Sequence, residues 1–165
     1  MRVPAGLEEL SQELSAVGEG LANVTEELRE MARGIHPSVL ADGGIAPALR
    51  TLARRSAVPV ELEIDADGRL PPQVEVAAYY VVSESLTNIA KHANATTAQI
   101  VATLSDSELR LAVRDDGSGG ADAGRGSGIT GLKDRVEALG GTLALSSAPG
   151  NGTLVEVVLP WEGSD

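Results

Sequence analysis

The chain has 165 residues, 42% of them hydrophobic, which is enough for one compact core. Its net charge of −11 argues against nucleic-acid binding, and the absence of cysteine excludes disulfides and thiolate zinc sites. There is no membrane-length apolar run and no basic-then-apolar leader, so we expect a cytoplasmic chain without membrane contact of its own, even if a longer protein containing it is membrane-attached.

The first 35 residues carry apolar side chains at alternating spacings of three and four. These are Leu7, Leu10, Leu14, Val17, Leu21, Val24, Leu28, Met31 and Ile35. This heptad pattern predicts a helical stalk over residues 1–40, suited to forming a homodimer through paired helices. A helix packed on its own domain stays open as the alternative. Pro37 after His36 is expected to end the helix.

Residues 41–165 are predicted to form one domain in which helices and strands are mixed. The expected elements, in chain order, are a helix at 45–55, a strand at 58–64, a helix from Pro72 to about His92, strands at 99–104 and 109–113, a helix at 129–139, and strands at 142–147 and 153–159. Both consecutive strand pairs are expected to form hairpins. This order predicts a mostly antiparallel sheet with helices on one face.

The helix ending near His92 carries a polar set, Glu84, Asn88, Lys91 and His92, at spacings of four, three and one. Residues four and seven or eight apart share a helix face, so Glu84, Asn88 and Lys91 would line one cleft. Asn88 would offer an oxygen to a hard cation, Lys91 or His92 would reach phosphate oxygens, and Glu84 would polarise a water or hydroxyl. The alternative is a solvated face with an ordinary charge pair.

Three glycine-rich segments follow. Asp115-Asp-Gly117-Ser-Gly119 ends a strand, where Asp115 could accept a hydrogen bond from an exocyclic amine. Gly126-Ser-Gly128-Ile-Thr-Gly131 opens a helix and presents free amides to an anion. Gly150-Asn-Gly-Thr153 lies in the last hairpin. Taken singly, each segment is equally compatible with an ordinary turn.

Taken in order, the four segments resemble the N box, two glycine boxes and final Gly-Thr motif of the ATP-binding domain of bacterial two-component sensor histidine kinases, in the GHKL superfamily. The resemblance covers about residues 20 to 160. The segment from Leu28 to Leu40 is also similar to the linker of the NarL/DesK-like subgroup.

This resemblance implies a Bergerat-type α/β two-layer sandwich preceded by an N-terminal helix, with ATP and Mg²⁺ bound to residues 41–165. It implies that Asn88 is the magnesium ligand and Asp115 the adenine anchor, that Lys91 and His92 face the phosphates, and that Thr153 lies near the adenine. The hinges and phosphate contacts of the ATP lid would be Gly117, Gly119, Gly126, Gly128 and Gly131. Glu84 corresponds to a hydrolytic base in related ATPases and is our candidate catalytic residue.

The only histidines are His36 and His92, and neither is followed by the acidic residue that usually adjoins a phosphoacceptor in this family. We therefore expect the phosphorylated histidine on a dimerisation domain of the same kinase, outside this chain, with a response regulator as the next acceptor. The isolated chain would then bind ATP only. Two alternatives stay open: a GHKL serine kinase acting as an anti-sigma factor, and a nucleotide-sensing dimerisation module without kinase activity.

Overall fold

This computed structural model describes residues 38–41, 43–66, 68–121 and 127–161. The chain divides into two compact units, Met1–His36 and Pro37–Asp165, and every described residue belongs to the second. The expected heptad helix, including His36, lies outside the described residues. At the end of the expected stalk, Leu40 is fully buried in the core of the second unit.

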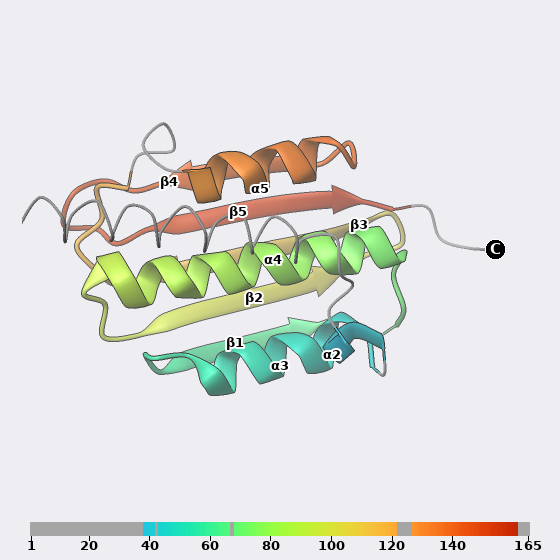
Figure 1. Cartoon of the computed structure of the whole chain (residues 1–165), viewed down its shortest axis with the longest axis horizontal. Coiled ribbons are helices and arrows are strands. Elements are labelled where there is room, and N and C mark those ends of the chain that lie inside the picture. The colour runs from blue at the N-terminus through green and yellow to red at the C-terminus, as the bar shows by residue number, and fades with distance from the viewer. Residues whose placement is uncertain (1–37, 42, 67, 122–126, 162–165) are drawn as a thin grey trace, which may run out of the picture. The chain divides into compact units, whose positions relative to one another are not determined.

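A five-stranded sheet forms one layer of this unit (Figure 1). Its strands are β1 (Val60–Asp65), β2 (Ala98–Leu104), β3 (Glu108–Asp115), β4 (Thr142–Ser146) and β5 (Leu154–Pro160). They lie in the order β1-β2-β3-β5-β4, where β1 pairs with β2 in parallel and every other pairing is antiparallel. The predicted mixed, mostly antiparallel sheet and both predicted hairpins are confirmed.

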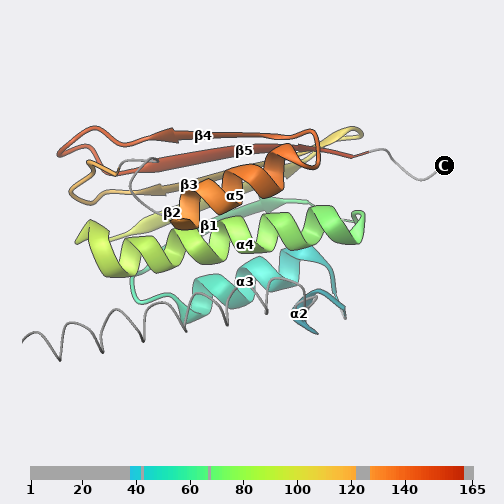
Figure 2. The ribbon, with the colours of Figure 1, turned by 45° about the horizontal axis from the view of Figure 1, so that its top comes forward.

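Helices form the second layer, and Figure 2 shows them side by side on one face of the sheet. They are α3 (Ile45–Arg55), α4 (Pro72–Asn88) and α5 (Ser127–Glu137), with a short α2 (Ser38–Ala41) that the sequence did not predict. This confirms the predicted two-layer sandwich. None of the described helices is both long and apolar enough to cross a bilayer.

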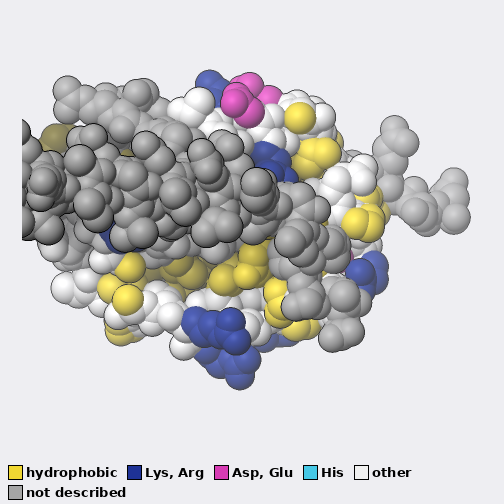
Figure 3. Space-filling view, in the orientation of Figure 1, with side chains coloured by type: hydrophobic (Ala, Val, Ile, Leu, Met, Phe, Trp, Pro, Cys, Tyr) yellow, Lys and Arg dark blue, Asp and Glu magenta, His cyan; other side chains and the backbone are white. Residues whose placement is uncertain are grey.

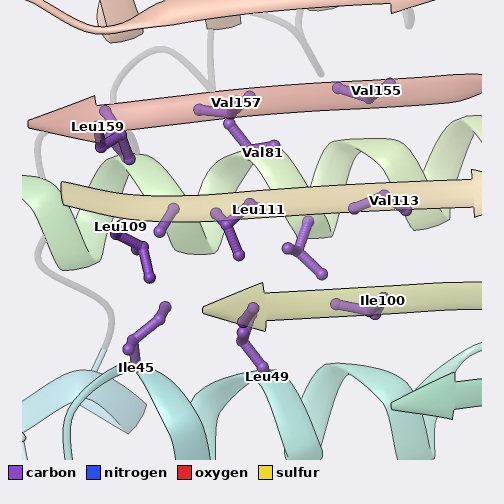
Figure 4. Close-up of a cluster of buried hydrophobic side chains, with 14 of the residues drawn as sticks. Ile45, Leu49, Val81, Ile100, Leu109, Leu111, Val113, Val155, Val157 and Leu159 are labelled. Carbon is purple, nitrogen blue, oxygen red and sulfur yellow. The ribbon is translucent and has the colours of Figure 1, made fainter. Parts of the chain in front are cut away.

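The core lies between the two layers (Figure 4). Strands β3 and β5 contribute side chains at alternate positions, because every second residue of a strand faces the helices. Their register places Val113 opposite Val155 and Leu111 opposite Val157. Ile45 of α3 packs into the same cluster. This shared core fixes the end of β3 relative to the helices.

Helix α3 exposes arginine side chains, whereas α4 begins with a buried glutamate. Basic side chains gather over α3 in Figure 3, where Arg50, Arg54 and Arg55 are exposed, and the last two complement the helix dipole at its C-terminal turn. At the start of α4, the fully buried Glu75 accepts a hydrogen bond from the Leu70 amide at 3.2 Å. Such paired burial fixes the loop that leads into the helix.

The C-terminal end of α4 departs from the prediction of one regular helix to about His92. The α-helix ends at Asn88, and the next turn, η1 (Ile89–Ala93), is a π-helix. Asn94 then takes a left-handed conformation with φ of 50°. Periodicity could not reveal this wider turn, which arises where the chain leaves the helix to meet the end of β3. Such turns are frequent at functional sites.

Candidate functional site

A cavity of about 420 Å³ opens at the end of the sheet where β3 stops, between α4, η1, α5 and the strands. This size lies within the range of small-molecule sites. Seven of the side chains or glycines predicted from the sequence line it: Glu84, Asn88, His92, Asp115, Gly119, Gly128 and Thr153. Residues from four separate sequence segments therefore meet at one cavity.

Glu84 and Asn88 stand one turn apart on α4 and both line the cavity. They share a helix face because they are four residues apart. Glu84 approaches the first turn of α5, since a Cβ built on Gly128 would lie 2.5 Å from the Glu84 Oε1 atom. Glycine at position 128 thus allows the carboxylate and this helix to come together.

The π turn separates Lys91 from the cavity. Lys91 and His92 are both exposed, but only His92 is among the residues that line the cavity. A π-helix has more residues per turn than an α-helix. His92, four positions after Asn88, therefore lies closer to the helix face of Asn88 than Lys91, which is three positions after it. The α-helical spacing predicted Lys91 on the face of Glu84 and Asn88, whereas His92 lines the cavity instead. The assignment of Lys91 and His92 to phosphate contacts stays a prediction.

Asp115, the last residue of β3, is a buried carboxylate in the cavity wall. Its side chain lines the cavity while the residue is only 4% exposed. Its Oδ1 atom accepts a hydrogen bond from the Gly117 amide at 2.8 Å. An ionised carboxylate has capacity for further donors, so Asp115 can accept a hydrogen bond from a ligand.

The first and last glycine segments form a single substructure beside Asp115. The Asp115 amide donates to the Thr153 carbonyl at 3.0 Å, the Gly152 amide to the Gly117 carbonyl at 3.0 Å, and the Gly150 amide to the Ser118 carbonyl at 2.7 Å. These bonds continue the β3–β5 pairing irregularly beyond the end of the sheet. The sequence indicated two separate turns and gave no signal that they bond to each other.

The remaining predicted glycines have different surroundings. Gly117 is buried but does not line the cavity, and a Cβ built on it would overlap the Ala93 backbone oxygen. Gly131 lies within α5 and is likewise not a lining residue. Gly126 falls outside the described residues. Gly117 thus allows close packing of two backbones, whereas any contact of these three glycines with a ligand stays a prediction.

The apolar wall of the cavity was not singled out from the sequence. It consists of Ile89, Ala93, Val113, Ile129, Leu132, Leu143, Leu145 and Val155. Strand alternation carries a signal for part of it, because Val113 is two residues before Asp115 and Val155 two residues after Thr153. An apolar wall with a few polar groups suits a ligand that has a flat, weakly polar part.

The carboxylate of Asp116 points away from this wall and ties β3 to the start of β2. It accepts hydrogen bonds from the Thr96 amide at 2.8 Å, the Thr97 amide at 3.0 Å and the Thr96 hydroxyl. The hydroxyl of Thr96, followed by the amide of Thr97, lowers the pKa of Asp116 from its ordinary value of 3.8. Asp116 is therefore a structural carboxylate, distinct in role from Asp115.

Replacing Asp116 with asparagine is expected to lower the urea midpoint of unfolding at neutral pH. A lowered pKa in the folded state means that the ionised carboxylate stabilises the fold above pH 3.8, and that this stabilisation is lost as the pH falls through the lowered value. Urea titrations of both proteins over a pH series would measure the difference. It should shrink in acid, and a difference that is constant with pH would contradict this role.

The cavity wall offers side-chain oxygens that could hold Mg²⁺. Within the described ranges, no group of three or more His, Cys, Asp or Glu side chains forms a metal site. Mg²⁺, however, is commonly held by one or two protein oxygens, substrate phosphates and water. The side-chain oxygens of Asn88 and Glu84 at the cavity wall fit that mode.

Comparison with known proteins identifies the family. Residues 73–163 match the family model of histidine kinase-, DNA gyrase B- and HSP90-like ATPases. The chain belongs to this ATPase family. The match includes every element of the cavity, from α4 to β5.

Relatives of this ATPase chain include sensor kinases. It is 34% identical over 151 residues to the signal transduction histidine-protein kinase/phosphatase UhpB of Salmonella typhimurium, and 35% identical over 150 residues to the sensor histidine kinase NarS of Mycobacterium tuberculosis. These alignments cover 83% and 86% of the chain. The chain spans only 29% and 35% of the length of these two relatives.

Solved structures of ATPase-family domains share the fold. The histidine kinase domain of the Erythrobacter litoralis blue-light activated kinase EL346 superposes with a TM-score of 0.57 at 27% identity, covering 69% of this chain and 56% of that one. The ATP-binding domain of PrrB from Mycobacterium tuberculosis gives a TM-score of 0.55 at 24% identity, covering 72% and 92%. These likenesses support the predicted ATP-binding fold.

Proposed function

We propose that this chain binds Mg-ATP and that, in a longer sensor kinase, it supplies the γ-phosphate to a histidine on the dimerisation domain. A response-regulator aspartate would then receive the phosphoryl group. The observation that carries this proposal is that Asn88 and Asp115 line one cavity of about 420 Å³ in a domain of this ATPase family. Together they would provide a cation ligand and a base-recognising carboxylate.

Each part of the site has a separate role in this proposal. Asp115 accepts a hydrogen bond from the exocyclic amine of adenine while the apolar wall contacts the base. Asn88 supplies an oxygen to Mg²⁺, which neutralises phosphate charge when bound. His92 lies on the next turn, near the expected phosphates. The cation matters because the chain as a whole carries a net charge of −11, which repels a triphosphate.

Glu84 is our candidate for assisting transfer. In the reaction, the bond between the γ-phosphorus and its bridging oxygen breaks, a bond to the histidine nitrogen forms, and ADP leaves. Glu84 lines the cavity beside Asn88 and faces the first turn of α5. From this position its carboxylate would orient the attacking imidazole, while positioning and charge neutralisation supply most of the rate.

Radiolabelled ATP distinguishes the histidine kinase from a serine kinase. The full-length protein containing this chain would be incubated with γ-labelled Mg-ATP and then treated with acid or alkali. We expect a protein label that is lost in acid and retained in alkali, as phosphohistidine behaves. An acid-stable, alkali-labile label would contradict the proposal and favour the serine kinase. Absence of label with intact ATP binding would favour the nucleotide-sensing module.

A further inference from the structure

Ser147 belongs to none of the family motifs described above. Ser147 follows β4 directly and is half-buried beside the cavity, which it does not itself line. Its hydroxyl bonds to two segments that do line the cavity. We infer that Ser147 is a positioning residue that holds the Gly119–Ala121 wall and the Thr153 hydroxyl in place for the nucleotide. This inference rests on the proposed binding of ATP.

Ser147 bonds to the glycine segment through both its side chain and its backbone. The Ala121 amide donates to the Ser147 Oγ atom at 2.9 Å, and the Gly120 amide donates to the Ser147 carbonyl at 3.2 Å. Gly119, Gly120 and Ala121 all line the cavity. One residue therefore fixes two successive amides of the cavity wall.

The Ser147 hydroxyl also bonds to the hydroxyl of Thr153. The Ser147 and Thr153 hydroxyl oxygens lie 2.9 Å apart, and the Ser147 Oγ atom also makes a longer contact of 3.4 Å to the Gly152 carbonyl. The Ser147 hydroxyl donates to the Gly152 carbonyl in the longer contact, and either hydroxyl can be the donor in the bond between Ser147 and Thr153. Ser147 thus fixes the place of the Thr153 hydroxyl beside the cavity.

The bonds that fix residues 115–118 do not extend to Gly119, Gly120 and Ala121. The segment 115–118 is already fixed by backbone bonds to Thr153, Gly152 and Gly150. Gly119 has a φ of 61° and Gly120 a φ of 79°, a backbone conformation that favours glycine. Glycine loses more conformational entropy than any other residue when its backbone is fixed, so ordering this stretch is costly. The hydrogen bonds that the amides of Gly120 and Ala121 donate both end on Ser147. A wall ordered in advance costs a ligand less entropy on binding.

The test compares Ser147→Ala with Ser146→Ala, a matched loss of hydroxyl at the adjacent, exposed position of β4. We expect Ser147→Ala to raise the Kd for Mg-ATP about 3- to 10-fold, the range that a lost hydrogen bond produces. The increase should appear in the dissociation rate. Ser146→Ala should bind as the unmodified chain does, and Ser147→Thr, which keeps the hydroxyl, should restore affinity.

Hydrogen exchange without nucleotide gives a readout independent of ATP. In Ser147→Ala, amides of Gly120 and Ala121 should exchange faster while those of the core strands do not change. Unchanged affinity in Ser147→Ala beside normal binding by the parent chain would overturn the inference and leave the proposed function intact. Faster exchange throughout the fold would also overturn it, since Ser147 would then be a general stabilising residue. If the parent chain does not bind Mg-ATP, both proposals fail.

Discussion

Replacing Asn88 with alanine is expected to remove the Mg²⁺-dependent part of ATP binding. Asn88 lies at the end of α4 and lines the cavity together with Glu84, which is one turn earlier on the same helix face. Loss of its oxygen should weaken Mg-ATP binding at least about tenfold, or about 1.4 kcal/mol. Calorimetric titration with ATP, in Mg²⁺ and in EDTA, measures this difference directly.

The matched control for Asn88 is Thr87→Ala. Thr87 is the preceding residue on α4, and its hydroxyl donates to the Ser83 carbonyl at 2.9 Å instead of lining the cavity. This variant should bind Mg-ATP as the parent chain does. If Asn88→Ala keeps the full Mg²⁺ dependence, the cation is held elsewhere and the assignment of Asn88 is wrong.

Replacing Gly152 with alanine is expected to destabilise the fold by about 2 to 5 kcal/mol, the sum of left-handed strain and overpacking. Gly152 has a φ of 68°, and a Cβ at this position would overlap the backbone carbonyl of Asp115. The clash is with backbone and cannot be relieved by a side-chain rotation. It would also break the bond from the Gly152 amide to Gly117, at the base of the cavity.

Gly150→Ala separates strain from overlap at the same turn. Gly150 has a φ of 79°, but nothing lies within 4 Å of a Cβ built on it. It should therefore lose only the strain contribution, about 1 to 2 kcal/mol. Urea denaturation of both variants provides the comparison. Equal losses for the two variants would show that Gly152 is not limited by the approach of Asp115.

Much of this fold could be predicted from local sequence patterns. Alternation in segments such as 109–113 indicated strands, and Pro72 correctly marked the start of α4. The wider turn after Asn88 escaped prediction because α and π turns use the same helix-forming residues. It is this turn that brings His92 into the cavity lining and leaves Lys91 out of it.

The polar site was also more predictable than the structure that holds it. Asn88 and Asp115 carry motif chemistry that can be read along the chain. The contact of Ser147 with Thr153 continues the β4–β5 register by one pair, whereas its contact with Ala121 joins residues 26 positions apart and follows no periodic pattern. The Ala121 contact depends on how the segment after β3 lies against the end of β4 in the folded chain. Residues that position a site from so far along the chain can be identified only from the three-dimensional structure.

The most direct test of an adenine site at Asp115 is a calorimetric comparison of ATP and GTP, both with Mg²⁺, on the unmodified chain. The Asp115 carboxylate should accept the adenine amine, whereas guanine presents a carbonyl oxygen at the equivalent ring position. We expect saturable ATP binding with GTP at least about tenfold weaker, because a buried carboxylate without a donor is costly. Equal affinity for the two nucleotides, or no binding of ATP, would contradict an adenine site at Asp115.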